Sequence, residues 1–193
     1  MGVRMIVKGL HNQNYLKTIL TKNNNFMLSS KDIANLTILI PELKPMFNFD
    51  HKHPHHHLDV WKHTLCALSL SENNFELRLA LLLHDVGKPH SFTEEDGIRH
   101  FKGHAEVSAK LCNKILQRLN FNQNFIEEIC QVIKQHDTPL TEEFIENNYK
   151  LAEKIFNVQT CDALAHNPAM NAKRIEYIEQ TKELFKNCNN LHK

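Results

Sequence analysis

The sequence predicts an all-α fold, and three observations support this prediction. Glycine and proline are scarce, with 5 and 6 copies, which favours long helices over many short strands and turns. Hydrophobic residues make up 41% of the 193-residue chain, enough for a packed core in one domain of ordinary size. Helical apolar periodicity recurs without a regular alternation of strands and helices, so a parallel sheet is not expected.

Residues 1–40 are predicted to form a helical N-terminal segment. Helices are expected over residues 3–21 and 30–40, separated by the Asn-rich stretch KNNNF at 22–26. Three prolines between residues 41 and 54 then predict a loop that leads into five closely spaced histidines, His51, His53, His55, His56 and His57. Residues 41–187 are predicted to form the main domain.

The first half of that domain contains two predicted helices and a turn. One helix is expected from about residue 56 to residue 71, and the next over residues 75–86. Gly87 and Pro89 form an ordinary helix stop signal. Residues 91–101 contain a Glu-Asp-Gly turn and are predicted to form a small hairpin or loop.

The second half is predicted to be helical throughout. Residues 103–119 form one amphipathic segment, and Asn124 with Glu127 resembles a capping box that opens the next helix. Thr141 is a candidate cap for another short helix. Segments 149–166 and 170–187 complete the all-α pattern.

The net charge limits the binding partners that are expected, and the cysteine content indicates the cellular compartment. The formal net charge is +1, so a long nucleic acid is not favoured, although a local basic rim is possible. Five cysteines without a CxxC pair indicate reduced core residues of a cytoplasmic protein. The sequence contains neither a signal peptide nor an apolar run of 18 residues, so no membrane contact is expected. Oligomeric state leaves no sequence signal.

Several polar residues occupy positions that should face the core. His84 and Asp85 follow the leucines at 81–83, and Asp162 shares an apolar helical face with Ile155 and Val158. A buried carboxylate costs several kcal/mol unless a partner compensates it. His63 and His136 lie on other helices, and His136 is in phase with apolar neighbours. Such side chains on facing helices suit one or two divalent transition metal ions, Mn, Fe, Co, Ni or Zn.

Simpler interpretations exist for each residue alone. His84 and His136 could interact with helix C-terminal dipoles, and His104 could face solvent at a helix start. Asp162 could form a buried salt bridge with a lysine or with His166. The histidines at 51–57 are expected to bind metal adventitiously at most, and only His57 is a candidate for the pocket lining.

Five segments together identify a resemblance. HHHLDVWKHTL, LRLALLLHDVGKP, HFKGHAEVSA, VIKQHD and CDALAHNP occur in the order typical of the HD-domain metal-dependent phosphohydrolases. The resemblance covers roughly residues 41–166 and is greatest to the HD domain of bacterial tRNA nucleotidyltransferases. The residues ahead of it contain neither the Gly-rich turn nor the paired aspartates of a nucleotidyltransferase head, so nucleotide addition to tRNA is not expected.

The resemblance implies a fold and a set of roles. The fold is an HD-domain helical bundle with a short helical N-terminal segment. His63, His84, Asp85 and Asp162 would bind one metal, while His104 and His136 would supply a second metal that Asp85 bridges. Lys88 would neutralise phosphate charge, and Asp59 would orient His63. A metal-activated water would then attack the phosphorus, with Asp85 and Lys88 as the catalytic residues.

The implied activity is that of a phosphomonoesterase or a phosphodiesterase acting on a small phosphorylated substrate, a nucleotide or a related phosphate ester. Lys88, His57, Arg99 and Lys102 are the candidate substrate contacts, although Arg99 and Lys102 could instead be solvated surface residues. Two alternatives stay open. One is a dinuclear-iron oxygenase on the same fold, and the other is a non-catalytic, metal-stabilised module that binds RNA or a nucleotide.

Overall fold

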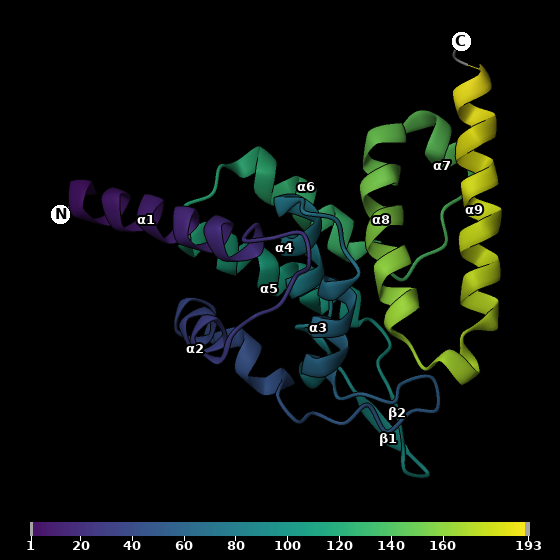
Figure 1. Cartoon of the computed structure of the whole chain (residues 1–193), viewed down its shortest axis with the longest axis horizontal. Coiled ribbons are helices and arrows are strands. Elements are labelled where there is room, and N and C mark those ends of the chain that lie inside the picture. The colour runs from purple at the N-terminus through teal and green to yellow at the C-terminus, as the bar shows by residue number, and fades with distance from the viewer. Residues whose placement is uncertain (1, 192–193) are drawn as a thin grey trace.

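The computed structural model describes residues 2–191, with side chains described for residues 11–188, and it confirms the all-α prediction. Helices form nearly all of the regular structure, and the β-structure in the described residues is a small hairpin and one isolated bridge (Figure 1). No helix in this part of the chain is long and apolar enough to cross a membrane.

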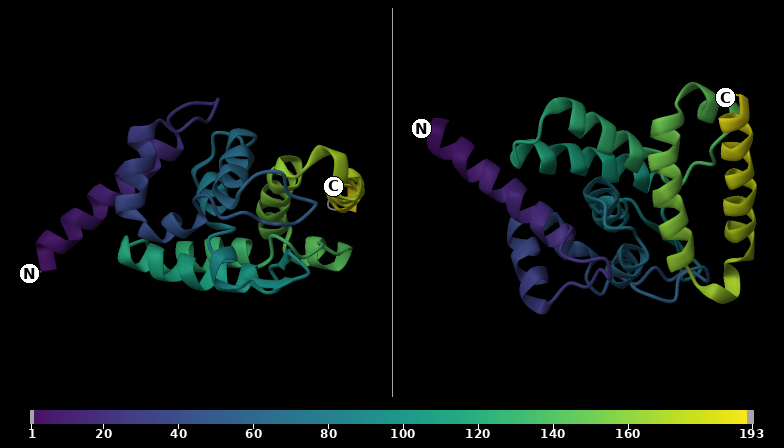
Figure 2. Two further views of the ribbon diagram at one scale, coloured as in Figure 1. Left: turned by 90° about the horizontal axis from the view of Figure 1, so that it is seen from below. Right: turned by 45° about the horizontal axis from the view of Figure 1, so that its top comes forward.

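The N-terminal part consists of α1 (Gly2–Leu20), α2 (Ser30–Leu39) and the 3₁₀ helix η1 (Pro41–Met46). The predicted break over residues 22–26 is confirmed. Ser29 begins α2 with a capping box, because its hydroxyl accepts from the Asp32 N–H while the Asp32 carboxylate accepts from the Ser29 N–H. Helix α1 extends outward at its N-terminal end, whereas the helix also contacts α2 and α4 (Figure 2).

Arg78 ties this N-terminal part to the rest of the molecule. It lies on α4 (Phe75–Leu83), is fully buried, and donates to the carbonyl oxygens of Leu20, Asn23 and Asn24 at 2.8–3.2 Å. The Phe26 ring lies 4.7 Å from its guanidinium carbon. A buried guanidinium needs several acceptors at once, and the loop between α1 and α2 supplies them.

The centre of the fold is α4. It contacts α1, α3 (Val60–Ser69), α6 (Gln123–Lys134) and α8 (Tyr149–Ala165), so it is covered on several sides. This explains its unbroken apolar run, residues 79–83, which is at most 1% exposed. Helix α5 (His104–Arg118) packs along α6, and α3 packs along α8.

The periphery is built from shorter elements and one long helix. Helix α7 (Glu142–Asn147), η3 (Pro168–Met170) and α9 (Ala172–Leu191) follow the α6 region, and α9 lies beside α8 at one edge (Figures 1 and 2). Strands β1 (Thr93–Glu95) and β2 (Ile98–His100) pair antiparallel, which confirms the predicted hairpin. The 3₁₀ helix η2 (Lys88–His90) connects α4 to this hairpin.

Some helix boundaries differ from the sequence prediction. Helix α3 begins at Val60 rather than near residue 56, because the Asp59 carboxylate caps it by accepting from the Lys62 N–H at 2.8 Å. Helix α6 is capped by Asn122 and not by the pair Asn124 and Glu127. The predicted cap at Thr141 is confirmed for α7.

All five cysteines are free thiols in the structure. Cys112, Cys161 and Cys188 are buried, as expected for core residues, and the other two are partly buried. The cytoplasmic location inferred from them stays a prediction.

Candidate metal centre

The structure brings all six predicted donors together in the interior. His63 comes from α3, His84 and Asp85 from the end of α4, His104 from the start of α5, His136 from just after α6, and Asp162 from α8. Each of these residues is at most 8% exposed. Five segments of chain therefore converge on one buried polar cluster inside an otherwise apolar bundle.

One half of the cluster is formed around Asp162. His63 Nε2 lies 2.7 Å from Asp162 Oδ1, and His84 Nε2 lies 3.5 Å from the same oxygen. Asp85 Oδ2 lies 3.3 Å from His84 Nε2 and 3.8 Å from His63 Nε2. Donor atoms of His63, His84 and Asp85 all lie within 4.8 Å of one another, close enough for one ion.

The other half uses the second oxygen of Asp85. Asp85 Oδ1 lies 3.3 Å from His104 Nε2 and 3.9 Å from His136 Nε2, and the two imidazole nitrogens are 3.2 Å apart. These three residues form a second group that could hold an ion. Asp85 thus contributes one oxygen to each half, which is the position of a bridging carboxylate.

Backbone carbonyls orient the imidazole rings. The Nδ1 atoms of His84, His104 and His136 lie 2.7, 2.9 and 2.7 Å from the carbonyl oxygens of Leu81, Phe101 and Ile133. Because a carbonyl oxygen can only accept, each Nδ1 carries a proton and each neutral ring presents the Nε2 lone pair to the cluster. His63 Nδ1 has a longer contact of 3.3 Å with the Ala165 carbonyl. This is the orientation expected of metal-ligating histidines.

The donors fit a divalent transition metal. Nε2 atoms of His104 and His136 lie 3.2 Å apart, and among the described residues His84 Nε2 and both carboxylate oxygens of Asp85 have no hydrogen-bond partner. Buried polar atoms without such partners are costly, and a cation bound between them would compensate them. Imidazole nitrogen with carboxylate oxygen is a donor set suited to Mn, Fe, Co, Ni or Zn.

The titration behaviour of the cluster agrees with a cation site. Burial alone would raise the pKa of Asp85, but His84, Lys88 and His104 outweigh it and hold this pKa well below its usual range. Burial would also lower the pKa of His84, yet the Asp85 and Asp162 carboxylates raise it to about 10. Without a metal, a proton on His84 therefore balances the carboxylates, and a metal would displace it.

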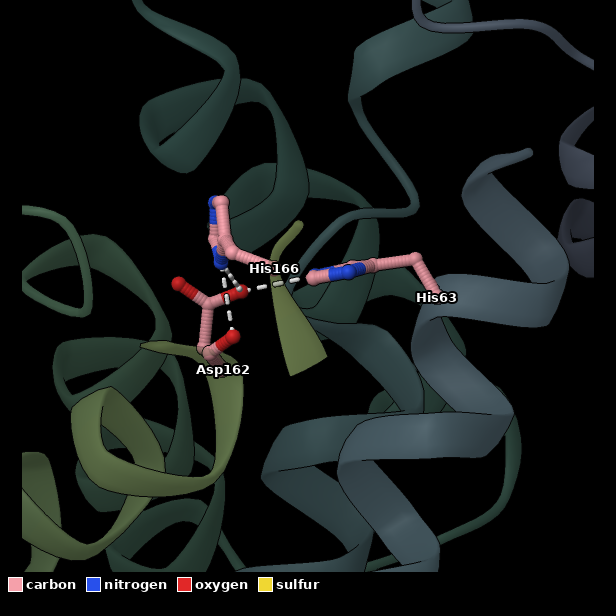
Figure 3. Close-up of side chains that lie close together, drawn as sticks. All are labelled: His63, Asp162 and His166. Carbon is pink, nitrogen blue, oxygen red and sulfur yellow. Dashed lines mark hydrogen bonds and ion pairs between the residues drawn. The ribbon is translucent and has the colours of Figure 1, made fainter. Parts of the chain in front are cut away.

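Asp162 also interacts with His166, one helical turn further along the chain. His166 Nδ1 donates to the Asp162 carbonyl at 2.7 Å and lies 3.8 Å from its carboxylate (Figure 3). His63 and His166 both point toward Asp162 in this view. The segment CDALAHNP carried the i, i+4 spacing that places these two residues on one helical face.

Two predicted roles differ from the structure. The Asp59 carboxylate does not orient His63; it caps α3 and pairs with Lys62 Nζ at 2.8 Å, while the Ala165 carbonyl approaches His63 Nδ1. His57 is exposed and lies outside the cavity lining, because its loop turns before α3 begins. The neighbouring His55 and His56 line the cavity instead.

A cavity of about 420 Å³ opens above the cluster, and Asp85, His104, His136 and Asp162 form part of its wall. Its cationic lining residues are Lys88, Arg99, Lys102 and Arg174. Lys88 Nζ lies 2.7 Å from Asp85 Oδ2. Arg99 is held in place by Glu94 Oε2 at 2.9 Å and by the Asp50 carbonyl. Three of the predicted substrate contacts therefore lie at the cavity.

Arg174 was not predicted as a cavity residue. It lies near the start of α9, beyond the last motif, and no local spacing marks it in the sequence. Its position depends on how α9 packs beside α8, which is a tertiary property. It adds a cationic side chain to a wall that also contains Lys88 and Lys102 together with the carboxylates of Asp85, Asp137 and Asp162.

Comparison with known proteins identifies the family. A model of the HD domain family matches residues 55–175, more than half of the chain. The chain belongs to the HD domain family. The HD protein is 37% identical over 118 residues to the CC-adding tRNA nucleotidyltransferase of Thermus thermophilus, a match that covers 58% of this chain and 27% of that relative. It is 33% identical over 117 residues to the A-adding tRNA nucleotidyltransferase of Deinococcus radiodurans, covering 57% and 27%.

A third relative is the multifunctional CCA protein of Legionella pneumophila, 30% identical over 129 residues, with 64% of this chain and 31% of the relative covered. The HD protein therefore spans about a quarter to a third of the length of these relatives. The matches confirm the predicted resemblance to the HD region of tRNA nucleotidyltransferases.

Proposed function

We propose that this HD protein is a metal-dependent phosphohydrolase that acts on a nucleotide or a related phosphate ester through a metal-activated water. The observation that supports this most directly is the shared position of Asp85. One of its oxygens faces His63 and His84 while the other faces His104 and His136. Asp85, His104 and His136 of this double donor set line a cavity whose wall also contains Lys88, Arg99, Lys102 and Arg174.

The residues divide into two groups by what they would hold. His63, His84, Asp85 and Asp162 would hold one ion, and Asp85, His104 and His136 would hold a second. A divalent metal bound there supplies a water-derived nucleophile at neutral pH and polarises a phosphoryl oxygen. The carbonyl contacts of the histidines keep their Nε2 lone pairs aimed inward, so little reorganisation is needed when the site is loaded.

Lys88 and the outer cavity wall would act on the substrate. Lys88 carries a positive charge beside Asp85 and faces the cavity, where it can donate to a phosphoryl oxygen. Lys102 and Arg174 place two further positive charges on the wall. An anionic substrate would be drawn into this cavity and held with its phosphate toward Asp85.

The cavity volume supports a small substrate. About 420 Å³ lies within the range of small-ligand pockets, and the chain has a net charge of only +1. The names of the relatives describe action on tRNA, so phosphate esters of nucleotides and of RNA ends are the first compounds to test. A long nucleic acid is less favoured because the chain has no basic excess.

Hydrolysis of a panel of nucleotide phosphomonoesters and phosphodiesters with added Mn, Co or Ni tests the proposal. Asp85→Asn should lower the rate by about 100-fold or more, because it removes a ligand common to both groups. Asp96→Asn, at the exposed turn of the hairpin, is the matched control and should keep the wild-type rate. Absence of hydrolysis of both ester types with every metal, or full activity of Asp85→Asn, would overturn the proposal.

The same preparations separate the two alternatives. Oxygen consumption that depends on bound iron would indicate an oxygenase. Binding of RNA or a nucleotide that is retained in Asp85→Asn, without turnover of any compound, would indicate a binding module.

A further inference from the structure

We infer that His51 is a positioning residue that fixes the Lys88 ammonium beside Asp85 while Lys88 keeps an N–H for a ligand in the cavity. His51 belongs to the loop over residues 51–57 and is not one of the six candidate metal ligands. The consequence of this positioning for catalysis rests on the proposed function, because it assumes that Lys88 donates to a substrate phosphate. The geometry itself does not depend on that function.

The hydrogen bonds of His51 define its tautomer. The side chain is fully buried, and Nδ1 lies 2.9 Å from the Leu58 carbonyl oxygen, which can only accept. Nδ1 therefore carries the proton, and Nε2 presents a lone pair. Lys88 Nζ lies 3.2 Å from this Nε2, and an ammonium can only donate. The Leu58 carbonyl and the Lys88 ammonium therefore require the same tautomer of His51, with the proton on Nδ1.

The Lys88 ammonium is held by two partners. Nζ forms an ion pair with Asp85 Oδ2 at 2.7 Å and donates a hydrogen bond to His51 Nε2 at 3.2 Å. The Phe101 ring lies 5.5 Å from the same nitrogen and covers another side. Lys88 is only 5% exposed, and it lines the cavity. An N–H of Lys88 that does not bond His51 is thus available to a substrate oxygen.

The imidazole of His51 is held rigidly. It stacks on the His56 ring at a centroid distance of 3.7 Å with an interplanar angle of 4°. Phe101 and His63 meet it edge-on at 5.6 and 5.7 Å. A lysine loses its rotational freedom when it is held between fixed acceptors, so a rigid acceptor makes the position of its charge reproducible.

A neutral acceptor suits this position better than an acidic one. A second carboxylate beside Lys88 would neutralise its charge and compete with the phosphate for it. An imidazole lone pair accepts the hydrogen bond and leaves the full positive charge on the ammonium. His51 therefore orients Lys88 without reducing its attraction for an anion.

The first test measures the position of Lys88 without any substrate. Reductive methylation of the protein with formaldehyde, followed by peptide mass spectrometry, gives the rate of modification at each lysine. His51→Phe keeps the ring shape but removes the acceptor, and Lys88 should then react about tenfold faster, as for loss of one hydrogen bond to a charged group. His51→Gln restores an acceptor oxygen and should react within about twofold of wild type.

His57→Phe is the matched control, since His57 is exposed, belongs to the same loop and does not line the cavity. Lys88 should react in this variant as in wild type. Equal Lys88 rates in His51→Phe and wild type, or equal rates in His51→Gln and His51→Phe, would overturn the inference. Because His51→Gln also makes the side chain smaller, simple opening of the cavity would speed the reaction of Lys88 in His51→Gln and leave it at the wild-type rate in His51→Phe, which is the reverse of the expected order.

The second test asks whether His51 acts through Lys88. Calorimetry with inorganic phosphate and metal-loaded protein gives a Kd for wild type, His51→Phe, Lys88→Gln and the double variant. We expect His51→Phe to raise this Kd about tenfold in the wild-type background and to have no further effect in Lys88→Gln. An equal effect of His51→Phe in both backgrounds would show a purely structural role and refute the inference.

The two tests separate this inference from the proposed function. A wild-type protein that neither binds phosphate nor hydrolyses any ester, yet shows the expected methylation pattern, would retain the Lys88 geometry and lose the phosphohydrolase proposal.

Discussion

Removal of the His104 imidazole should halve the metal content of the HD protein, whereas removal of the Asp85 carboxylate should abolish it. His104→Ala leaves Asp85 and His136 as the only donors of their group but does not touch His63, His84 or Asp162. Asp85→Ala removes an oxygen from both groups. We expect about two ions per chain in wild type, about one in His104→Ala and close to none in Asp85→Ala.

The loss of bound metal in these variants should also appear as a smaller stabilisation by metal in thermal unfolding. An ion present at 100 times its dissociation constant stabilises the folded state by about 2.7 kcal/mol. In a domain of this size, 1 kcal/mol corresponds to roughly 2–4 °C, so each ion should raise Tm by about 5–10 °C. The difference between metal-loaded and metal-free Tm should therefore be about twice as large in wild type as in His104→Ala, and near zero in Asp85→Ala.

Elemental analysis and scanning calorimetry on protein made without a histidine tag provide both quantities. His57→Ala is the matched control, because it removes an exposed histidine outside the cavity and should leave both readings unchanged. Comparison of loaded and metal-free forms within each variant cancels any intrinsic loss of stability from the substitution.

Two results would refute the reasoning. Equal metal content in His104→Ala and wild type would show that Asp85, His104 and His136 do not hold an ion. Metal binding in Asp85→Ala at the wild-type level would show that the carboxylate is not a ligand at all. Iron as the native metal would direct the next assays to oxygen chemistry before phosphate release.

Three further predictions follow from other parts of the fold. Arg78→Met should lower the free energy of unfolding by about 3 kcal/mol or more in urea titrations, because buried carbonyls lose a charged donor; a loss below about 1 kcal/mol would contradict this. Gly87→Ala should cost about 1–3 kcal/mol and weaken the second ion, measured by metal titration, because a Cβ there would lie 2.6 Å from the His104 carbonyl oxygen; unchanged binding would argue against this close approach. The Tm of metal-free protein should be highest near pH 6.5. Burial lowers the pKa of His166 to about 4, so the folded state binds fewer protons than the unfolded state and loses stability as pH falls from 6.5 toward 4. Against the effect of burial, the Asp85 and Asp162 carboxylates raise the pKa of His84 to about 10, so the stability that this histidine contributes is lost as pH rises from 6.5 through 10. A Tm that only rises across pH 4–10 would contradict the His84 assignment, and a Tm that only falls would contradict the His166 assignment.

Periodicity and motif order predicted most of the architecture. The helices over residues 75–83, 104–118 and 149–165 lie within the predicted segments, and the hairpin formed where expected. These elements have strong apolar periodicity or a local turn signal, and both are properties of neighbouring residues.

The candidate donors were also predictable, since polar residues at core positions stand out from an apolar face. Asp85 and Asp162 each interrupt such a face, and the structure buries both. The distance between Asp85 and Asp162 was not predictable from periodicity, because it depends on how α4 and α8 cross. Only the resemblance to the HD family indicated that the two aspartates belong to one site.

The loop over residues 51–59 was the least predictable region. Its histidines have no periodicity, and the prediction of His57 as a lining residue rests only on its being nearest in the chain to the helix that carries His63. The cap at Asp59 starts α3 late, and the chain before it folds back so that His51 becomes buried and His57 exposed. Whether a loop residue faces the interior is decided by tertiary packing and not by local sequence.

The distribution of the donors over α3, α4, α5, α6 and α8 also affects the dynamics of the HD protein. Two bound cations that share Asp85 would cross-link segments as far apart as residues 63 and 162, so no single one of these helices could open without breaking a coordination bond. Local opening would become more expensive than in the metal-free chain by the binding free energy of the ion. Amide hydrogens on all five helices should then exchange as one cooperative unit, whereas α9, which supplies no donor, would exchange independently of metal.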